Sequence, residues 1–149
     1  MSLPNVSSDL VWEVVRNQNA FLVKSKLSGG VQFSRDPLNL TNLHSRKYAG
    51  FVNDKAVGVI PTEKGVKVIS KKSSATNQPA KALINTTYNK SGRKTYKSVA
   101  NLAAKSGYRA DLRKAAVARA SAIKKSQRPV KETPEKKLRG KKAAAAASE

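Results

Sequence analysis

The chain has 149 residues, no cysteine, and 30 Lys and Arg against 9 Asp and Glu, for a formal net charge of +21. The absence of cysteine excludes disulfides, thiolate zinc sites and a cysteine nucleophile. No apolar run approaches the roughly 18 residues of a membrane-spanning helix, and residues 1–20 lack the layout of a signal peptide. Self-repulsion at this charge opposes compaction, so we expect a polyanionic partner, for which nucleic acid is the usual choice.

The positive charge is concentrated in the second part of the chain. Residues 1–60 hold 7 Lys and Arg with 4 acids, whereas residues 61–149 hold 23 Lys and Arg with 5 acids. The length suits one compact domain with appendages. We expect a small mixed α+β body over residues 1–70, a polar linker or extended segment over 71–91, a basic helical pair over 92–127 and a disordered basic tail over 128–149.

The first half of the chain predicts one short helix followed by short strands. Residues 8–17 fit a helix that Ser8 or Asp9 caps. The pair Gly29-Gly30 marks a turn, and Pro37 with its Asn and Thr neighbours makes residues 36–47 irregular. Strands are expected at residues 20–24, 31–34, 51–53, 56–60 and 66–72, the last three as an antiparallel meander.

Two helices dominate the second half. Residues 82–88 fit either a strand or an extended connector. Residues 92–106 have helical spacing of apolar side chains, with Gly107 as the stop, and an Ala-rich helix is expected over 110–126. The predicted fold class is therefore α+β: a short N-terminal helix, a small antiparallel sheet, two basic C-terminal helices and an extended basic tail.

The Ala-rich helix has an apolar face and a basic arc. The apolar face holds Leu112, Ala116, Ala120 and Ile123. The basic arc holds Arg113, Lys114, Lys124 and Lys125. No acid lies on this arc, because Asp111 sits at the helix start, whereas ordinary solvated faces mix both signs. The arc therefore favours RNA phosphates, and Arg119 either packs past the core edge or brings a second face to RNA.

The predicted helix at 92–106 is also rich in basic residues. Arg93, Lys94 and Lys97 lie in its opening turn, and Lys105 lies at its end. Cations at a helix N-terminus oppose the macrodipole, and a bound phosphate would reverse that cost. A phosphate site at this helix start is therefore one hypothesis, with a solvated surface as the alternative.

Two of the four tyrosines directly adjoin a cation. Tyr48 follows Lys47, and Tyr108 precedes Arg109. A tyrosine beside Lys or Arg can stack on unpaired bases, although packing in the core is the ordinary role of such a side chain. Both roles stay open for these two tyrosines.

Catalysis and metal binding find no support in the sequence. The single histidine, His44, has no cysteine and no second histidine to share a metal. No carboxylates are paired at helical spacing, and no GxxxxGK[ST] phosphate loop is present. We expect no enzyme activity, no cofactor, no metal and no small-molecule substrate.

Four stretches resemble the eukaryote-specific large-subunit ribosomal protein twenty-eight (L28e-type) family. They are WEVVRNQNAFLVK from residue 12, NL…SRKYAGFVN at 39–53, AVGVIP from residue 56 and YRADLRKAAVARASAIKKSQRPV at 108–130. They cover roughly residues 8–130 in the family's order, and the last is the most specific. The linker at 71–81 and the Lys/Ala tail match poorly.

The resemblance implies a non-enzymatic α+β protein on ribosomal RNA at the large-subunit surface. Its implied partners are large-subunit ribosomal RNA and neighbouring ribosomal proteins, with no membrane and no homo-oligomer. Its implied location is the cytoplasmic ribosome, with assembly in the nucleolus. Residues in matched segments that face or approach RNA include Arg16, Arg46, Lys47, Arg109, Arg113 and Arg119.

Charge and resemblance together predict a set of RNA-binding residues. These residues would contact mainly the phosphate backbone and recognise the shape of the RNA, with little readout of bases. The set is Arg16, Arg46, Lys47, Tyr48, Lys71, Lys72, Arg93, Lys94, Lys97, Lys105, Tyr108, Arg109, Arg113, Lys114, Arg119, Lys124, Lys125 and Arg128.

Two other classes of protein share parts of this pattern. A chromatin protein of linker-histone type is also highly basic, but its Lys-rich tail is normally much longer than about twenty residues, and its globular part is a winged helix. A ribosome-assembly factor with a similar N-terminal domain would be longer and carry an acidic tail. Both readings rank behind a ribosomal RNA clamp.

Overall fold

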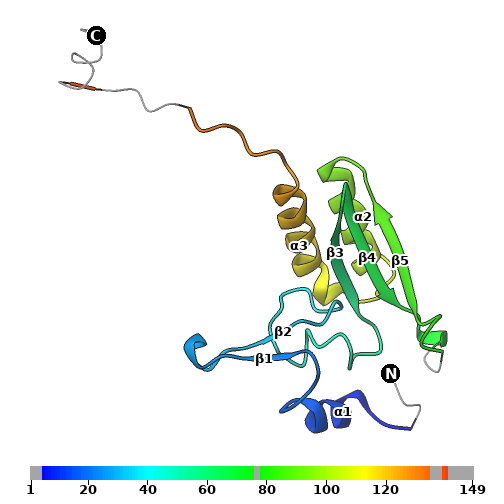
Figure 1. Cartoon of the computed structure of the whole chain (residues 1–149). Coiled ribbons are helices and arrows are strands. Elements are labelled where there is room, and N and C mark those ends of the chain that lie inside the picture. The colour runs from blue at the N-terminus through cyan, green and yellow to red at the C-terminus, as the bar shows by residue number, and fades with distance from the viewer. Residues whose placement is uncertain (1–4, 76–77, 135–138, 141–149) are drawn as a thin grey trace.

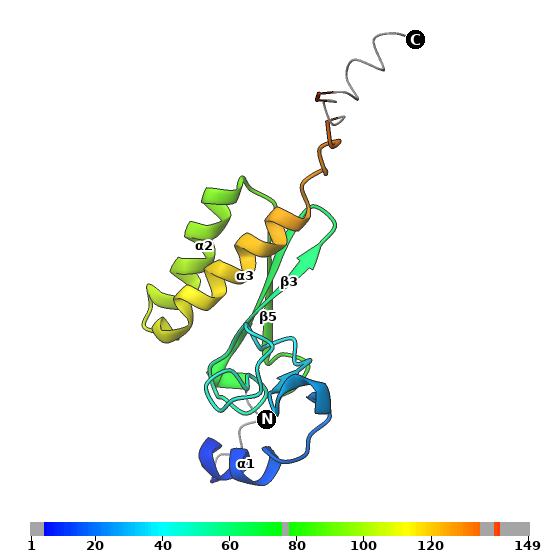
Figure 2. The same cartoon turned by 90° about the vertical axis from the view of Figure 1, so that its left-hand side faces the viewer.

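The computed structural model describes residues 5–75, 78–134 and 139–140, and its fold class is the predicted α+β. A three-stranded antiparallel sheet has the order β3 (Val57–Thr62), β4 (Gly65–Lys71), β5 (Leu83–Tyr88). Helices α2 (Gly92–Ala104) and α3 (Arg113–Ser126) lie side by side and cover one face of this sheet (Figures 1 and 2).

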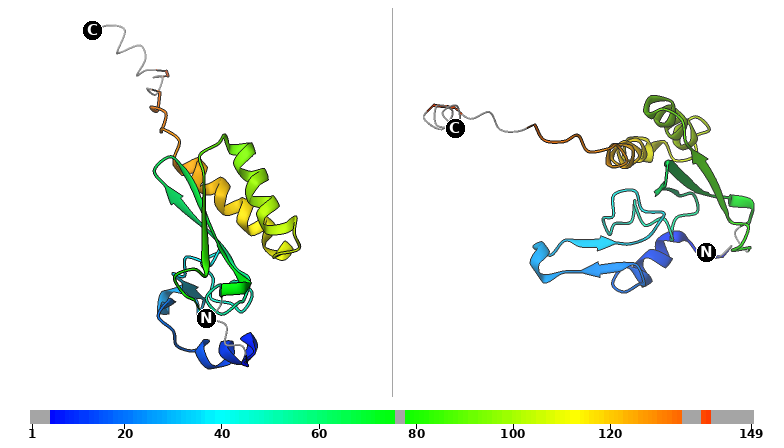
Figure 3. Two further views of the ribbon diagram at one scale, coloured as in Figure 1. Left: turned by 90° about the vertical axis from the view of Figure 1, so that its right-hand side faces the viewer. Right: turned by 45° about the horizontal axis from the view of Figure 1, so that its top comes forward.

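The N-terminal elements form a smaller lobe at one end of the sheet (Figure 3). It contains α1 (Ser8–Val15) and the antiparallel pair β1 (Leu22–Lys24) and β2 (Gln32–Ser34). Single 3₁₀ turns occur at η1 (Lys26–Ser28), η2 (Ser73–Ala75) and η3 (Ala110–Leu112). The ambiguous segment 82–88 is thus a strand, and the second C-terminal helix starts with a 3₁₀ turn.

One hydrophobic core joins the sheet to the two helices. Valines from β3 and β4 pack against Val99 of α2, against Leu112 of η3 and against Ala116 and Ala120 of α3. The alanines are fully buried, which lets α3 approach the sheet closely. The core therefore contains side chains from both the 1–70 and the 92–127 segments. The strand β5, which lies between these segments in the sequence, completes the sheet.

A second, smaller core holds the N-terminal lobe. Trp12 of α1 packs against Ala49 and Val52, with Phe51 beside them. The predicted strand at 51–53 is wrong, because these residues form turns: the N–H groups of Val52 and Asn53 donate to the Ala49 carbonyl at 3.1 and 3.2 Å. Their apolar side chains are buried in this local core and add no strand to the sheet.

The predicted cap of the first helix is also wrong. The Ser7 hydroxyl accepts from the Leu10 N–H at 3.2 Å and caps α1. The Ser8 and Asp9 side chains bind Arg46, so they hold the helix to the 45–53 turn. Of the predicted disordered tail, residues 128–134 and 139–140 contain no helix or strand, and the rest lies outside the described residues.

Gly58 marks the place where the lobe and the sheet meet. A Cβ atom at this position would overlap the Pro37 carbonyl oxygen, which presses on the sheet face opposite the helices. Gly58→Ala should therefore lower the free energy of unfolding by about 1–3 kcal/mol, the usual cost of overpacking. Urea unfolding of the free protein measures this.

The matched control is Thr87→Ala, an exposed position on β5 where the change should stay within about 0.5 kcal/mol. Equal stabilities of the two variants would contradict the close packing at Gly58.

Candidate nucleic-acid interface

An open groove of about 840 Å³ runs between the outer faces of α2 and α3. Small and short side chains from both helices line much of it, including Ala100, Ala118 and Ser121. Lys97 from α2 and Arg113 and Lys114 from α3 also line it. Because the small residues leave room between the helices, a phosphate backbone can come close while the longer cationic side chains reach it.

The cations of the groove are available for a ligand. Lys97, Arg113 and Lys114 are exposed. In the described ranges the ion pairs are Arg16–Glu13, Arg46–Asp9 and Arg109–Asp111, so no acid neutralises the groove. Three like charges held near one another on a rigid helix pair create a local positive potential that attracts a polyanion.

A second basic cluster lies where α2 begins and α3 ends. Lys64, Lys124 and Arg128 line an open cavity together with Gly92, the first residue of α2, and with one carboxylate, that of Glu63. The Ser91 side chain makes no capping bond, and the first turn of α2 carries no acid. Arg93 and Lys94 are exposed in the same turn, so the predicted cations of both helix ends are brought together here.

Sequence reasoning missed two polar members of these surfaces. Asn101 lines the groove, and Lys64 lies in the cluster at the helix ends. Lys64 sits in the turn between β3 and β4, and only the packing of that turn against the helix pair identifies it. Lys105, Lys125 and Lys72 are exposed at the positions that the sequence predicted, outside the groove.

Arg119 is bound within the protein. Its Nε donates to the Val59 carbonyl at 2.7 Å, and its Nη1 donates to the Leu40 carbonyl and to Asn42 Oδ1 at 3.1 and 2.9 Å. Burial lowers the pKa of the guanidinium. The structure thus supports the first of the two roles considered for Arg119. Its aliphatic stem packs past the edge of the core, and its guanidinium binds backbone carbonyls.

Two further predicted arginines also have partners inside the protein. Arg109 makes a two-point ion pair with Asp111 at 2.8 Å and donates to the Lys55 and Lys47 carbonyls. Arg46 binds Asp9 at 2.7 Å. These guanidinium groups connect α1, the 45–55 segment and the start of α3, so they stabilise the fold.

Lys71 and Tyr108 meet at the base of the sheet. Lys71 Nζ donates to the Phe51 and Asn53 carbonyls at 3.1 and 2.9 Å. The Tyr108 hydroxyl donates to the Lys71 carbonyl at 2.7 Å and accepts from the Ala56 N–H at 3.2 Å. Burial raises the pKa of this phenol. Tyr108 is therefore a packed, hydrogen-bonded residue of the main core edge.

The remaining predicted residues lie at the lobe. Tyr48 is half-buried against the main core, with the Lys47 ammonium 5.6 Å from its ring centroid. Arg16 is half-exposed and paired with Glu13 at 3.1 Å. These positions do not join the groove between the helices.

The described residues contain no group of three or more His, Cys, Asp or Glu that could hold a metal ion. His44 instead stacks near Trp12, with ring centroids 4.9 Å apart, and a ring nitrogen bonds the Arg16 carbonyl. A search of the helices in the same ranges finds none long and apolar enough to cross a membrane.

Comparison with known proteins gives consistent matches. Residues 10–126 match the model of the Ribosomal L28e protein family. The chain is 48% identical to large ribosomal subunit protein eL28 of Schizosaccharomyces pombe over 130 residues, which are 85% of this chain and 97% of the relative. It is 38% identical to the Caenorhabditis elegans eL28 over 82% of this chain and 91% of the relative. The Dictyostelium discoideum eL28 is 33% identical over 90% and 98%.

Arg119 and Lys125 lie on the same helix and have opposite environments. Arg119→Ala leaves two carbonyls without their donors and should lower the free energy of unfolding by about 2–3 kcal/mol. Lys125→Ala removes an exposed cation and should change it by less than about 0.5 kcal/mol. Urea unfolding of both variants measures the difference, and equal stabilities would contradict a structural role for Arg119.

The Arg109–Asp111 pair predicts a pH dependence. The hydrogen bond from Arg109, and its charge, hold the pKa of the Asp111 carboxyl below its usual value, while partial burial opposes this. The pair therefore stabilises the fold fully above pH about 4, and this stabilisation is lost as the pH falls through the folded-state pKa.

Asp111→Asn should lower the free energy of unfolding by less than about 1 kcal/mol at pH 7, because the carboxylate is partly exposed. The difference from the native chain should shrink below pH about 4. A difference that stays constant from pH 7 to pH 3 would rule out the ion pair as its cause.

Proposed function

Since the chain belongs to the Ribosomal L28e protein family, we propose that it is a non-enzymatic structural component of the large ribosomal subunit. In this role the basic surface of α2 and α3 clamps ribosomal RNA. The observation that carries the proposal is the groove between the two helices, which no acid lines and whose three exposed cations have no ion-pair partner in the described part of the chain. The protein would join the subunit in the nucleolus and function on cytoplasmic ribosomes.

The clamp works by neutralising phosphates that otherwise repel one another. A backbone seated in the groove would meet Lys97 on one side and Arg113 and Lys114 on the other. Each phosphate contact also releases a condensed counterion. α3 has 14 residues and is thus about 21 Å long, so one RNA segment can reach from the groove to the cluster at the helix ends.

We assign the predicted RNA-binding residues three different roles. The primary phosphate ligands are those on the helix pair and at its ends: Arg93, Lys94, Lys97, Arg113, Lys114, Lys124, Lys125 and Arg128. Arg16, Lys47, Tyr48, Lys72 and Lys105 are secondary contacts outside the groove. Arg46, Lys71, Tyr108, Arg109 and Arg119 act indirectly, because they fix the body that presents the helices.

Recognition through this surface should depend on backbone and shape more than on base sequence. Lys and Arg reaching past alanines meet phosphate oxygens, which carry no sequence information. No aromatic ring of the described residues lies fully exposed in the groove; its one aromatic, Tyr96, is half-buried. The free energy of binding should therefore be strongly salt-dependent.

The test reverses two groove charges, Arg113→Glu with Lys114→Glu. Affinity for deproteinised large-subunit RNA should fall at least about tenfold, because two phosphate contacts are replaced by repulsion. In cells, a tagged copy should be depleted from large subunits purified on sucrose gradients after EDTA splitting.

The matched control is Lys26→Glu with Arg35→Glu, the same charge change at two exposed cations of the N-terminal lobe. This control should keep most of its RNA affinity and its place in the subunit. Normal occupancy of the groove variant, or equal loss in both variants, would contradict the proposed clamp. Sedimentation of the native chain with chromatin would instead favour the linker-histone class.

A further inference from the structure

The two outer edges of the three-stranded sheet differ in how they are protected. On the β3 edge, the Val59 carbonyl accepts from Arg119, and Pro61 has no N–H to offer. Proline on an edge strand with its nitrogen turned outward is a common protection against strand addition. Among the described residues the β5 edge has no such device, and no helix or strand runs along its outer side in Figure 1 or in the left view of Figure 3, which looks onto this edge.

The hydrogen-bond alternation shows which groups of β5 are free. The Lys71 N–H donates to the Ala56 carbonyl on the β3 side, and the Lys72 N–H donates to the Ala82 carbonyl on the β5 side. Since antiparallel pairing alternates along a strand, the residues that bond to β4 are 82, 84, 86 and 88. The backbone groups of Leu83, Asn85 and Thr87 therefore point away from the sheet, with no partner among the described residues.

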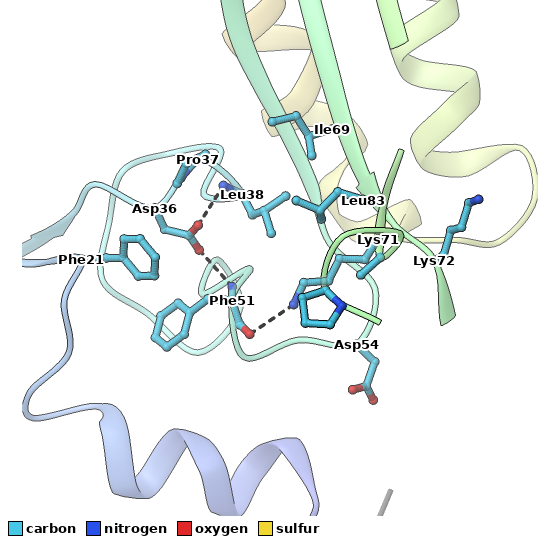
Figure 4. Close-up of a pocket in the computed structure, with 12 residues that line it drawn as sticks. Phe21, Asp36, Pro37, Leu38, Phe51, Asp54, Ile69, Lys71, Lys72 and Leu83 are labelled. Atoms are coloured by element: carbon cyan, nitrogen blue, oxygen red, sulfur yellow. Dashed lines mark hydrogen bonds between the residues drawn. The ribbon is translucent and has the colours of Figure 1, made fainter. Parts of the chain in front are cut away.

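A pocket of about 420 Å³ lies at one end of this free edge. Eight of its twelve lining residues are apolar, and they come from the lobe, from β4 and from the start of β5. Figure 4 shows Phe21 and Phe51 on the lobe side, facing Ile69 and Leu83 of the sheet. Its volume lies within the ~300–1,000 Å³ range of pockets that bind ligands.

The polar groups around the pocket hold its walls in place. Asp36 Oδ1 accepts from the Leu38 N–H at 3.0 Å, and Oδ2 accepts from the Phe51 N–H at 2.9 Å. The Lys71 ammonium is committed to two carbonyls, as described above. The pocket is therefore preformed, and its walls need no ligand to satisfy these groups.

Charge distinguishes the pocket from the RNA-facing helices. Its lining contains two carboxylates, Asp36 and Asp54, and two ammonium groups, Lys71 and Lys72. This balance is unusual in a chain with 30 cations and 9 acids. The balanced lining offers a phosphate backbone no net positive charge, and a phosphate would have to lose its water in an apolar site, so the occupant suited to this site is a protein segment.

We propose that an extended segment of a neighbouring ribosomal protein pairs with the free edge of β5 and places a large apolar side chain in this pocket. Main-chain hydrogen bonds to Leu83, Asn85 and Thr87 would supply affinity, and the pocket would supply specificity, as in other cases of strand addition. The inference rests on the proposed place of the chain in the large subunit. A second copy of this chain is disfavoured, since each copy carries a net charge of +21.

The first experiment identifies the occupant in purified large subunits. A photo-crosslinking amino acid replaces Thr87, whose side chain is exposed beside the free edge, in a tagged full-length chain. A second chain carries it at Ala118 in the helix groove. We expect the Thr87 probe to crosslink to one ribosomal protein, in an extended segment with a large apolar residue, and the Ala118 probe to crosslink to RNA.

The second experiment tests the two contacts separately, with the Thr87 probe in place. Asn85→Pro removes an outward N–H at a position where an edge strand tolerates proline, and Asn85→Thr keeps that N–H. Leu83→Asp puts a charge at the pocket, and Leu83→Met keeps its apolar volume. Crosslinking should fall at least tenfold in Asn85→Pro and in Leu83→Asp, and stay within twofold in both controls.

The outcomes separate this inference from the proposed function. Crosslinks from Thr87 to RNA, to a second copy of the chain or to nothing would overturn the docking site, as would equal yields from Asn85→Pro and Asn85→Thr. If the Ala118 probe still reaches RNA, the clamp stands without the docking site. A chain that never enters the subunit overturns both, and unfolding midpoints of the free variants show whether each still folds.

Discussion

The contact on which the architecture depends is the attachment of the Arg119 guanidinium to the edge of β3. One side chain of α3 binds Val59 in the sheet and the 40–42 loop of the lobe at the same time. It thereby fixes the helix against both parts of the protein and closes one edge of the sheet. A half-buried cation on carbonyl oxygens also lets a very basic chain use some of its charge internally.

The cations of the described residues thus fall into two groups, those bound to acceptors inside the protein and those without an acidic partner. Arginines whose planar groups bind two or more acceptors, such as Arg109 and Arg46, lie where segments distant in sequence meet. Arg113 and the exposed lysines of the helix pair meet no acid in the described ranges. The fold thus presents a rigid, unneutralised surface, which is what binding to a polyanion without large rearrangement requires.

The same division separates two faces of the sheet. The helices cover one face and carry the basic groove, while the opposite face meets the lobe and carries the charge-balanced pocket. A protein wedged between RNA and protein neighbours would need both kinds of surface. The open edge of β5 lies next to the pocket, and the protected edge of β3 lies under α3.

Much of the fold was predictable from local pattern, and most long-range polar contacts were not. The helical period placed Leu112, Ala116 and Ala120 on the buried face, and the structure confirms this. The helical period separated Arg119 from the basic arc of Arg113 but left its role open, because nothing in the sequence shows that residue 119 meets a carbonyl 79 positions away. The strand predicted at 51–53 was wrong because burial in the lobe core, with a turn around Ala49, outweighed β propensity.

If RNA covers the helix pair and leaves Lys26 of the lobe open, lysine acetylation footprinting will show it directly. Lysines are acetylated in intact large subunits, in ribonuclease-treated subunits and in the free chain, and read by mass spectrometry. Lys97 and Lys114 should be protected in intact subunits and become reactive after ribonuclease, while Lys26 should react in all three samples. Full reactivity of Lys97 and Lys114 in intact subunits, or protection that survives ribonuclease, would contradict coverage of the helix pair by RNA.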